Sequence, residues 1–209
     1  MPVKIAVLVS GGGTNLQAVI DACDRGQIDG QVALVVGSRK GIYALERARN
    51  HHIDAVVVSS KQHPDLVERG ERLLALFAQY QIDLIVLGGY LSMISPAVVR
   101  AYENRIVNTH PALIPAFCGK GFYGERVHQA VLDYGAKVSG VTIHLVNEQY
   151  DAGPIVLQGT VPVKEGDTAQ TLAARVLEVE HRLLPEAVAL LAEGRIRVDG
   201  RIVHILEKA

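Results

Sequence analysis

Asn108 and His110 are the residues whose types and spacing most suggest chemistry. They lie two positions apart in the run Val-Asn-Thr-His-Pro, residues 107–111. Residues two apart in an extended segment share a face, so the amide and the imidazole point the same way and Thr109 points away. An amide N–H can stabilise a developing oxyanion, and an imidazole, with a reference pKa of about 6.5, can exchange a proton near neutral pH. The pair therefore suits acyl-type chemistry.

The local sequence places this pair at the carboxyl end of a strand. Residues 105–107 form a short apolar run typical of a buried strand, and Pro111 lacks the N–H that a sheet ladder needs. An Asn that caps a turn beside a half-exposed His explains the same residues without chemistry. Asp151 lies in an Asp-Ala-Gly-Pro turn, where an acid is usually a turn former, but folding could bring it against the imidazole.

A glycine-rich turn, Ser-Gly-Gly-Gly-Thr-Asn at residues 10–15, follows another apolar run. It opens a helix expected over 16–25, so its backbone N–H groups lie at the positive end of the helix dipole. This predicts a phosphate site, although a tight turn that needs flexible dihedrals is the simpler explanation. The dinucleotide pattern Gly-x-Gly-x-x-Gly fails because Leu16 takes its last position, yet Arg39 or Lys40 could face a 2′-phosphate.

The loop at residues 88–96 is too apolar to face plain solvent. Two glycines follow a predicted strand, and Leu91, Met93 and Ile94 then offer an apolar wall with adaptable methionine packing. A pocket for a flat hydrophobic ligand fits this pattern, and so does a loop buried beneath the next helix.

The elements that must position these residues alternate along the chain. Strands are expected over residues 4–9, 31–36, 54–58, 83–87 and 105–107, with helices between them. This alternation predicts an α/β fold with a doubly wound, mostly parallel sheet, whose ligands bind at the carboxyl ends of the strands.

The last third of the chain follows a different pattern. Residues 139–146 and 154–162 are typical of an antiparallel pair of strands. Thr168 is expected to N-cap a long helix, and 195–207 to form a terminal hairpin.

The composition is that of an ordinary globular protein, with 49% hydrophobic and 21% charged residues among 209. A net charge of -1 gives no basic field for nucleic acid or for an anionic membrane. Cys23 and Cys118 lack metal-like spacing and suit a reducing compartment. No apolar run reaches the roughly 18 residues of a membrane span, and no signal peptide is apparent, so we expect a cytoplasmic protein.

Together these motifs resemble the glycinamide ribonucleotide formyltransferases, a folate-dependent branch of the formyltransferase family. The resemblance covers nearly the whole chain and depends on residues 10–16, 89–91, 108–115, 140–144, 151–154 and 180–181. It implies a Rossmann-like fold with a mostly parallel seven-stranded sheet that contains one antiparallel strand. It also implies a single domain, with a phosphate-binding half over 1–104 and a catalytic and folate-binding half over 105–209.

The resemblance assigns roles to individual residues. Asn108, His110 and Asp151 would be catalytic. Independently of the resemblance, Thr142 and His144 face the same side of their strand and could order Asp151, although a satisfied core histidine explains His144 equally well. The substrates would be bound by three groups: Gly13, Thr14 and Asn15 at the phosphate, Glu180 at the ribose or glycinamide, and Leu91, Ser92, Met93, Ile94 and Val146 at the folate. Ser92 stands where the family commonly has Arg or Lys, which leaves its contact to the folate tail open.

The implied reaction transfers the formyl group of 10-formyltetrahydrofolate to the amine of glycinamide ribonucleotide in de novo purine biosynthesis. Asn108 and His110 would stabilise the tetrahedral oxyanion, and Asp151 would keep His110 basic. No metal is required. The expected partners are these small molecules, with no nucleic acid and no membrane, and the protein is expected as a monomer or homodimer.

Three alternatives remain open. One is another formyltransferase or hydrolase that uses 10-formyltetrahydrofolate, although the hydrolase usually has an N-terminal regulatory domain and the tRNA enzyme a C-terminal barrel, for which this chain has no room. A second is an NADP-dependent reductase that uses the glycine-rich turn and Arg39. A third is a nucleotide-sensing module without turnover.

Overall fold

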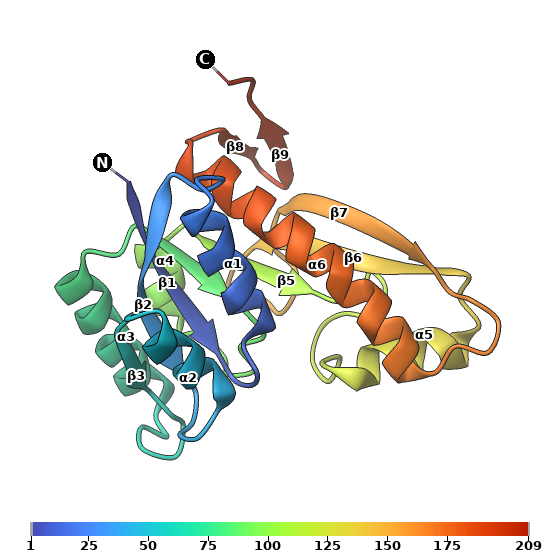
Figure 1. The fold of residues 1–209 in the computed structure, drawn as a ribbon, viewed down its shortest axis with the longest axis horizontal. Helices are drawn as coiled ribbons and strands as arrows, with labels where there is room; N and C mark the ends of the chain where they lie inside the picture. Colours follow the sequence, from blue (N-terminus) through green and yellow to red (C-terminus); the bar gives the residue numbers. More distant parts are fainter. Residues whose placement is uncertain (1, 209) are drawn as a thin grey trace.

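The computed structural model describes residues 2–208 and shows a seven-stranded sheet covered by helices (Figure 1). The strands of this sheet are β1 Val3–Val9, β2 Gly30–Gly37, β3 Ala55–Val57, β4 Leu84–Leu87, β5 Ile106–His110, β6 Val138–Leu145 and β7 Ile155–Pro162. The helices are α1 Thr14–Asp24, α2 Tyr43–Asn50, α3 Leu66–Tyr80, α4 Pro96–Ala101, α5 Glu125–Tyr134 and α6 Ala169–Ala192. A separate two-stranded sheet joins β8 Ile196–Asp199 to β9 Ile202–Ile205 and confirms the expected terminal hairpin.

The sheet has the strand order β3-β2-β1-β4-β5-β6-β7. Strands β1 to β5 pair in parallel, whereas β6 runs antiparallel to both β5 and β7. The prediction of a doubly wound, mostly parallel sheet with one antiparallel strand is therefore confirmed. The strand order reverses between β1 and β4, and sheets of this kind bind ligands at that point, beside the carboxyl ends of the strands.

Two apolar clusters hold the layers together, one on each face of the sheet. In β1, Val7 and Val9 belong to the cluster that includes side chains of α1, α2 and α6, while Ala6 and Leu8 belong to the cluster with α3 and α4. Alternate residues of a strand point to opposite faces, so a continuous apolar run fills both clusters. In Figure 1, α6 crosses the sheet beside α1 on one of these faces.

Strand β5 is longer than the sequence predicts. We expected it to end at Val107, but it continues to His110 because β6 pairs with its last residues. Asn108 lies opposite His144, and His110 lies opposite Thr142. Pro111 then ends the strand, since it has no N–H for the ladder. The pairing fixes the direction in which the two polar side chains point.

The long helix α6 begins where the sequence predicts. The hydroxyl of Thr168 accepts a hydrogen bond from the backbone N–H of Thr171, and the side chain of Thr171 accepts one from the backbone N–H of Thr168. This reciprocal cap satisfies two N–H groups that a helix start leaves unpaired. No helix within residues 2–208 is long and apolar enough to cross a membrane.

Candidate functional site

Asn108 and His110 lie on the same face of β5, as expected from their spacing. The amide Nδ2 of Asn108 is 3.1 Å from Nε2 of His144 on the neighbouring strand. His144 is 2% exposed and His110 is 4% exposed, so both imidazoles are buried. The amide is thus held in one orientation and keeps a second N–H for another acceptor.

Asp151 lies between these two imidazoles. Its carboxylate is 3.6 Å from Nδ1 of His110 and 3.7 Å from Nε2 of His144. The backbone N–H of Gly119 donates a 2.8 Å hydrogen bond to the same carboxylate. The fold therefore brings together the turn after β6, the end of β5 and the 116–124 loop. The sequence suggested only that Asp151 could meet His110.

The pKa of His110 lies below its usual value. Burial lowers the pKa most, while the charge of Asp151 and a hydrogen bond to the carbonyl of Phe117 raise it and the nearby His144 lowers it further. We expected Asp151 to keep His110 basic, but burial outweighs that effect. Nε2 of His110 lies 2.8 Å from the carbonyl oxygen of Phe117, which can only accept, so Nε2 carries the proton. Nδ1, which faces Asp151, is the position that gains a proton when the imidazole becomes charged.

Asp151 itself remains ionised. Burial raises the pKa of this carboxyl group, but the interaction with His144, the N–H of Gly119 and the neighbouring imidazole of His110 together lower it below its ordinary value. A fixed carboxylate beside a buried imidazole stabilises the imidazolium form. The pair can therefore accept a proton during a reaction although His110 is neutral at rest.

Thr142 fixes the turn that follows β5. Its hydroxyl donates to the carbonyl of Ala112 at 2.7 Å and accepts from the backbone N–H of Ile114 at 3.0 Å. The amide of Gln158 donates to the same oxygen at 3.0 Å. Thr142 is therefore bound to the turn and positions the chain beside His110.

The glycine-rich turn opens α1 as expected, with the helix beginning at Thr14 rather than Leu16. Gly13 has a φ of 74°, and a Cβ atom there would lie 2.6 Å from Cβ of Ala44. Close packing against α2 thus requires Gly13 irrespective of any ligand. Added Cβ atoms at Gly11 and Gly12 would meet nothing within 4 Å, so these two glycines leave open space before the helix.

Asn15 and Glu180 connect the turn to α6. The amide of Asn15 donates a 2.9 Å hydrogen bond to the carboxylate of Glu180, which is 7% exposed. Burial raises the pKa of Glu180, and the contact with Asn15 partly opposes that shift. The hydroxyl of Thr109 lies near the same carboxylate but makes no hydrogen bond of standard geometry. Glu180 therefore keeps hydrogen-bonding capacity free.

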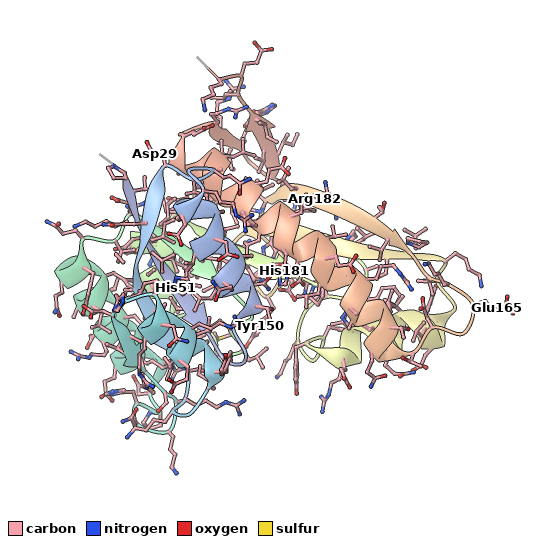
Figure 2. The ribbon with its side chains drawn as sticks, viewed as in Figure 1. Asp29, His51, Tyr150, Glu165, His181 and Arg182 are labelled. Carbon is pink, nitrogen blue, oxygen red and sulfur yellow. The ribbon has the colours of Figure 1, made fainter. Side chains whose placement is uncertain are left out.

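A cavity of about 850 Å³ brings together the three predicted catalytic residues and some of the predicted binding residues. Its wall includes six of the residues predicted from the sequence, namely Leu91, Ser92, Asn108, His110, Asp151 and Glu180. Tyr150, which is 53% exposed and labelled in Figure 2, also lies on this wall. Catalytic and binding candidates thus share one cavity at the carboxyl edge of the sheet.

The predicted folate wall is brought together only in part. Leu91, which is 65% exposed, lines the cavity, and its backbone N–H donates to the hydroxyl of Ser10 at 2.9 Å. Met93 does not line this cavity, and Ile94 and Val146 pack against the apolar cluster of α3 and α4.

Thr14 borders a second cavity, of about 520 Å³, whose wall comes mainly from α1 and α6. Arg47 and His181 share its wall, and Figure 2 shows His181 where α6 passes α1. The Nε atom of Arg47 donates to the carbonyl of Gly12 at 2.9 Å. The cationic side chain of Arg47 thus lies beside the predicted phosphate site.

The sequence did not predict three groups that contact the catalytic residues or line the main cavity. The carbonyl of Phe117, which contacts His110, and the N–H of Gly119, which contacts Asp151, are backbone atoms that no side-chain pattern marks. His128, which is 4% exposed, lines the cavity from α5. Its helical spacing with the buried residues Val127 and Val131 was a signal for its burial that we did not use.

Comparisons with known proteins identify relatives of this chain. A family model described as "Formyl transferase" matches residues 3–188. A chloroplastic phosphoribosylglycinamide formyltransferase of Arabidopsis thaliana is 44% identical over 200 residues, which are 94% of this chain and 68% of that protein. A phosphoribosylglycinamide formyltransferase of Haemophilus influenzae is 35% identical over 99% of this chain and 95% of its own length.

A solved structure has nearly the same fold. The crystal structure of glycinamide ribonucleotide transformylase 1 from Symbiobacterium toebii superposes with a TM-score of 0.93 at 43% identity. The superposition covers 98% of this chain and 94% of the other.

Proposed function

The chain belongs to the formyl transferase family, and from this premise we propose that it transfers a formyl group from 10-formyltetrahydrofolate to the amine of glycinamide ribonucleotide. The observation that carries the proposal is the single cavity in which Asn108, His110 and Asp151 lie beside Glu180. An oxyanion donor, a proton acceptor and a group that binds hydroxyls or amines are what such a transfer needs. The named activities of the relatives support the same choice of substrates.

The reaction begins when the neutral amine of the ribonucleotide attacks the formyl carbon. A C–N bond forms and the formyl oxygen becomes an oxyanion, which accepts a hydrogen bond from the free N–H of Asn108. Nδ1 of His110 takes the proton released by the attacking amine, so that its new N–H can also donate to the oxyanion, and the carboxylate of Asp151 stabilises the imidazolium. Collapse of the intermediate breaks the bond to the folate nitrogen, and the proton passes from His110 to that nitrogen through Asp151 and water.

The binding groups divide between the two substrates. Gly13, Thr14 and Asn15 would hold the phosphate of the ribonucleotide at the N-terminus of α1, and Glu180 would bind its ribose or glycinamide. Asn15 would connect the phosphate site to the ribose or glycinamide site, because its amide already contacts Glu180. The pterin would lie along Leu91 and Ser92, with Met93, Ile94 and Val146 bordering it from the neighbouring cluster.

The two halves of the sheet would have separate tasks within one domain. Residues 1–104 would supply the phosphate site and residues 105–209 the catalytic and folate-binding groups, and β4 and β5 pair across this boundary. Thr142 and His144 would support the turn and Asp151. The proposed enzyme acts in the cytoplasm on small molecules, as a monomer or homodimer, without a metal and without nucleic acid.

The test is a product assay with the purified protein. Glycinamide ribonucleotide and 10-formyltetrahydrofolate should give formylglycinamide ribonucleotide and tetrahydrofolate in equal amounts. Omitting the ribonucleotide should stop release of tetrahydrofolate. Release of formate at an undiminished rate without the ribonucleotide would instead indicate a hydrolase and would overturn the proposal.

A further inference from the structure

His128 is a buried polar side chain for which the catalytic steps above have no use. It lies on α5, is 4% exposed and lines the main cavity. Its Nδ1 atom has no hydrogen-bond partner among residues 2–208. Buried polar atoms in folded proteins nearly always have a partner, so one without a partner at a cavity wall indicates a group that a ligand satisfies.

The position of α5 decides which ligand this is. Val131 of α5 belongs to the apolar cluster that contains α1 and α6, as do the partly buried Phe117 and Leu132. In Figure 1, α5 and one end of α6 lie together at the same end of the sheet. Ile94 and Val146, on the predicted folate side, pack against the opposite cluster. His128 therefore reaches the cavity from the face of the sheet that carries Glu180.

We propose that His128 is a further binding residue for the ribonucleotide, to which it hydrogen-bonds through a hydroxyl or amide group of the ribose or glycinamide portion. This inference rests on the proposed function, because it assigns a contact to one of its two substrates. The wall between α5 and α6 would then hold the sugar, with Glu180 and His128 as its two buried polar groups.

The state of the imidazole favours a neutral ligand group over the phosphate. Burial lowers the pKa of His128, and the nearby His110 lowers it further, while Glu125 raises it to a smaller extent. A neutral imidazole has one N–H donor and one acceptor nitrogen, which together suit a hydroxyl or an amide. A phosphate would instead need donors only.

The substitution His128→Leu separates binding from a structural role. Leu fills a similar space and removes a polar atom that has no partner, so the ligand-free protein should keep its melting temperature or gain slightly. The Michaelis constant for the ribonucleotide should rise about five- to tenfold, the range for one lost hydrogen bond between neutral groups. Turnover and the Michaelis constant for 10-formyltetrahydrofolate should change less than twofold, because the substitution leaves the catalytic group His110 in place.

His128→Gln is the matched control, because it retains a donor and an acceptor at nearly the same position. It should recover part of the lost affinity, which can be measured as thermal protection by glycinamide ribonucleotide without any turnover. Protection by tetrahydrofolate should be equal in the wild type and both variants.

The possible outcomes separate this inference from the proposed function. If the ribonucleotide protects the wild type and His128→Leu equally, or if the variant loses protection by tetrahydrofolate, His128 is not the ribonucleotide contact. A large fall in the melting temperature of ligand-free His128→Leu would show a structural role and would also overturn the inference. If the ribonucleotide fails to protect even the wild type, the proposed function fails and the inference falls with it.

Discussion

Asp151 faces His110 with 3.6 Å between its carboxylate and Nδ1, and the N–H of Gly119 holds that carboxylate independently of the imidazole. The carboxylate therefore keeps its place whether or not His110 carries a charge. An Asn at position 151 can accept the same hydrogen bond from Gly119 through its side-chain oxygen. Asp151→Asn thus removes the charge and leaves the position of the side chain nearly unchanged.

This relationship predicts the direction in which His110 titrates. Burial lowers the pKa of His110 and Asp151 partly offsets that shift. Removing the charge should therefore move the pKa of His110 still lower in Asp151→Asn than in the wild type. NMR titration of the imidazole measures both values, with His51, an exposed histidine outside the cavity, as an internal reference. An unchanged pKa at His110 would mean that the two groups do not interact.

The glycine-rich turn contains two positions with opposite expected responses. Gly13→Ala should lower the free energy of unfolding by at least about 1 kcal/mol, because a left-handed conformation disfavours a Cβ and Ala44 blocks it. Gly12→Val adds a side chain in open space at the approach to α1. It should leave the melting temperature near that of the wild type and raise the Michaelis constant for the ribonucleotide far more than that for the folate. Equal increases for both substrates would contradict a phosphate site at this turn.

The sequence predicts structural features that have local causes, and it misses features that depend on residues far along the chain. The face shared by Asn108 and His110 follows from the period of a strand, and the cap at Thr168 follows from residue type, so both were correct. The length of β5 depends on pairing with β6, and the need for glycine at position 13 depends on Ala44.

The depth of burial of a side chain is also not apparent from the sequence. A pattern of residue types indicates that His110 and Asp151 could meet, but the direction of the net pKa shift follows from how deeply the imidazole is enclosed. Backbone partners such as the carbonyl of Phe117 are likewise set by the path of a loop.

Leu91 tests the folate side of the cavity. Tetrahydrofolate should raise the melting temperature of the wild type by mass action, and Leu91→Asp should abolish that increase. Leu91 is 65% exposed, so the charge itself should cost little stability. Protection by the ribonucleotide should remain. Val67→Asp, at a 62% exposed position of α3 outside the cavity, is the matched control and should behave as the wild type. Normal protection of Leu91→Asp by tetrahydrofolate would place the pterin elsewhere.

Three histidines that are buried or partly buried predict how stability depends on pH. Burial lowers the pKa of His110, His128 and His181. Their folded values therefore lie below the unfolded value of about 6.5, and the unfolded chain binds more protons as the pH falls through this window. The free energy of unfolding should decrease between about pH 7 and pH 5, and less steeply in His128→Leu. Urea denaturation across this range measures it, and stability that is constant or increases towards pH 5 would rule out neutral burial of these groups.

We propose that His110 and Asp151 act as one catalytic unit in formyl transfer, and a double-mutant cycle on turnover tests this coupling most directly. His110→Ala and Asp151→Asn should each lower kcat by on the order of a hundredfold or more, as the loss of a transition-state contact does. Once one partner is gone the other has little left to contribute, so the double variant should be scarcely slower than the poorer single variant. Single effects that multiply in the double variant would show that the two residues contribute independently and would contradict the account.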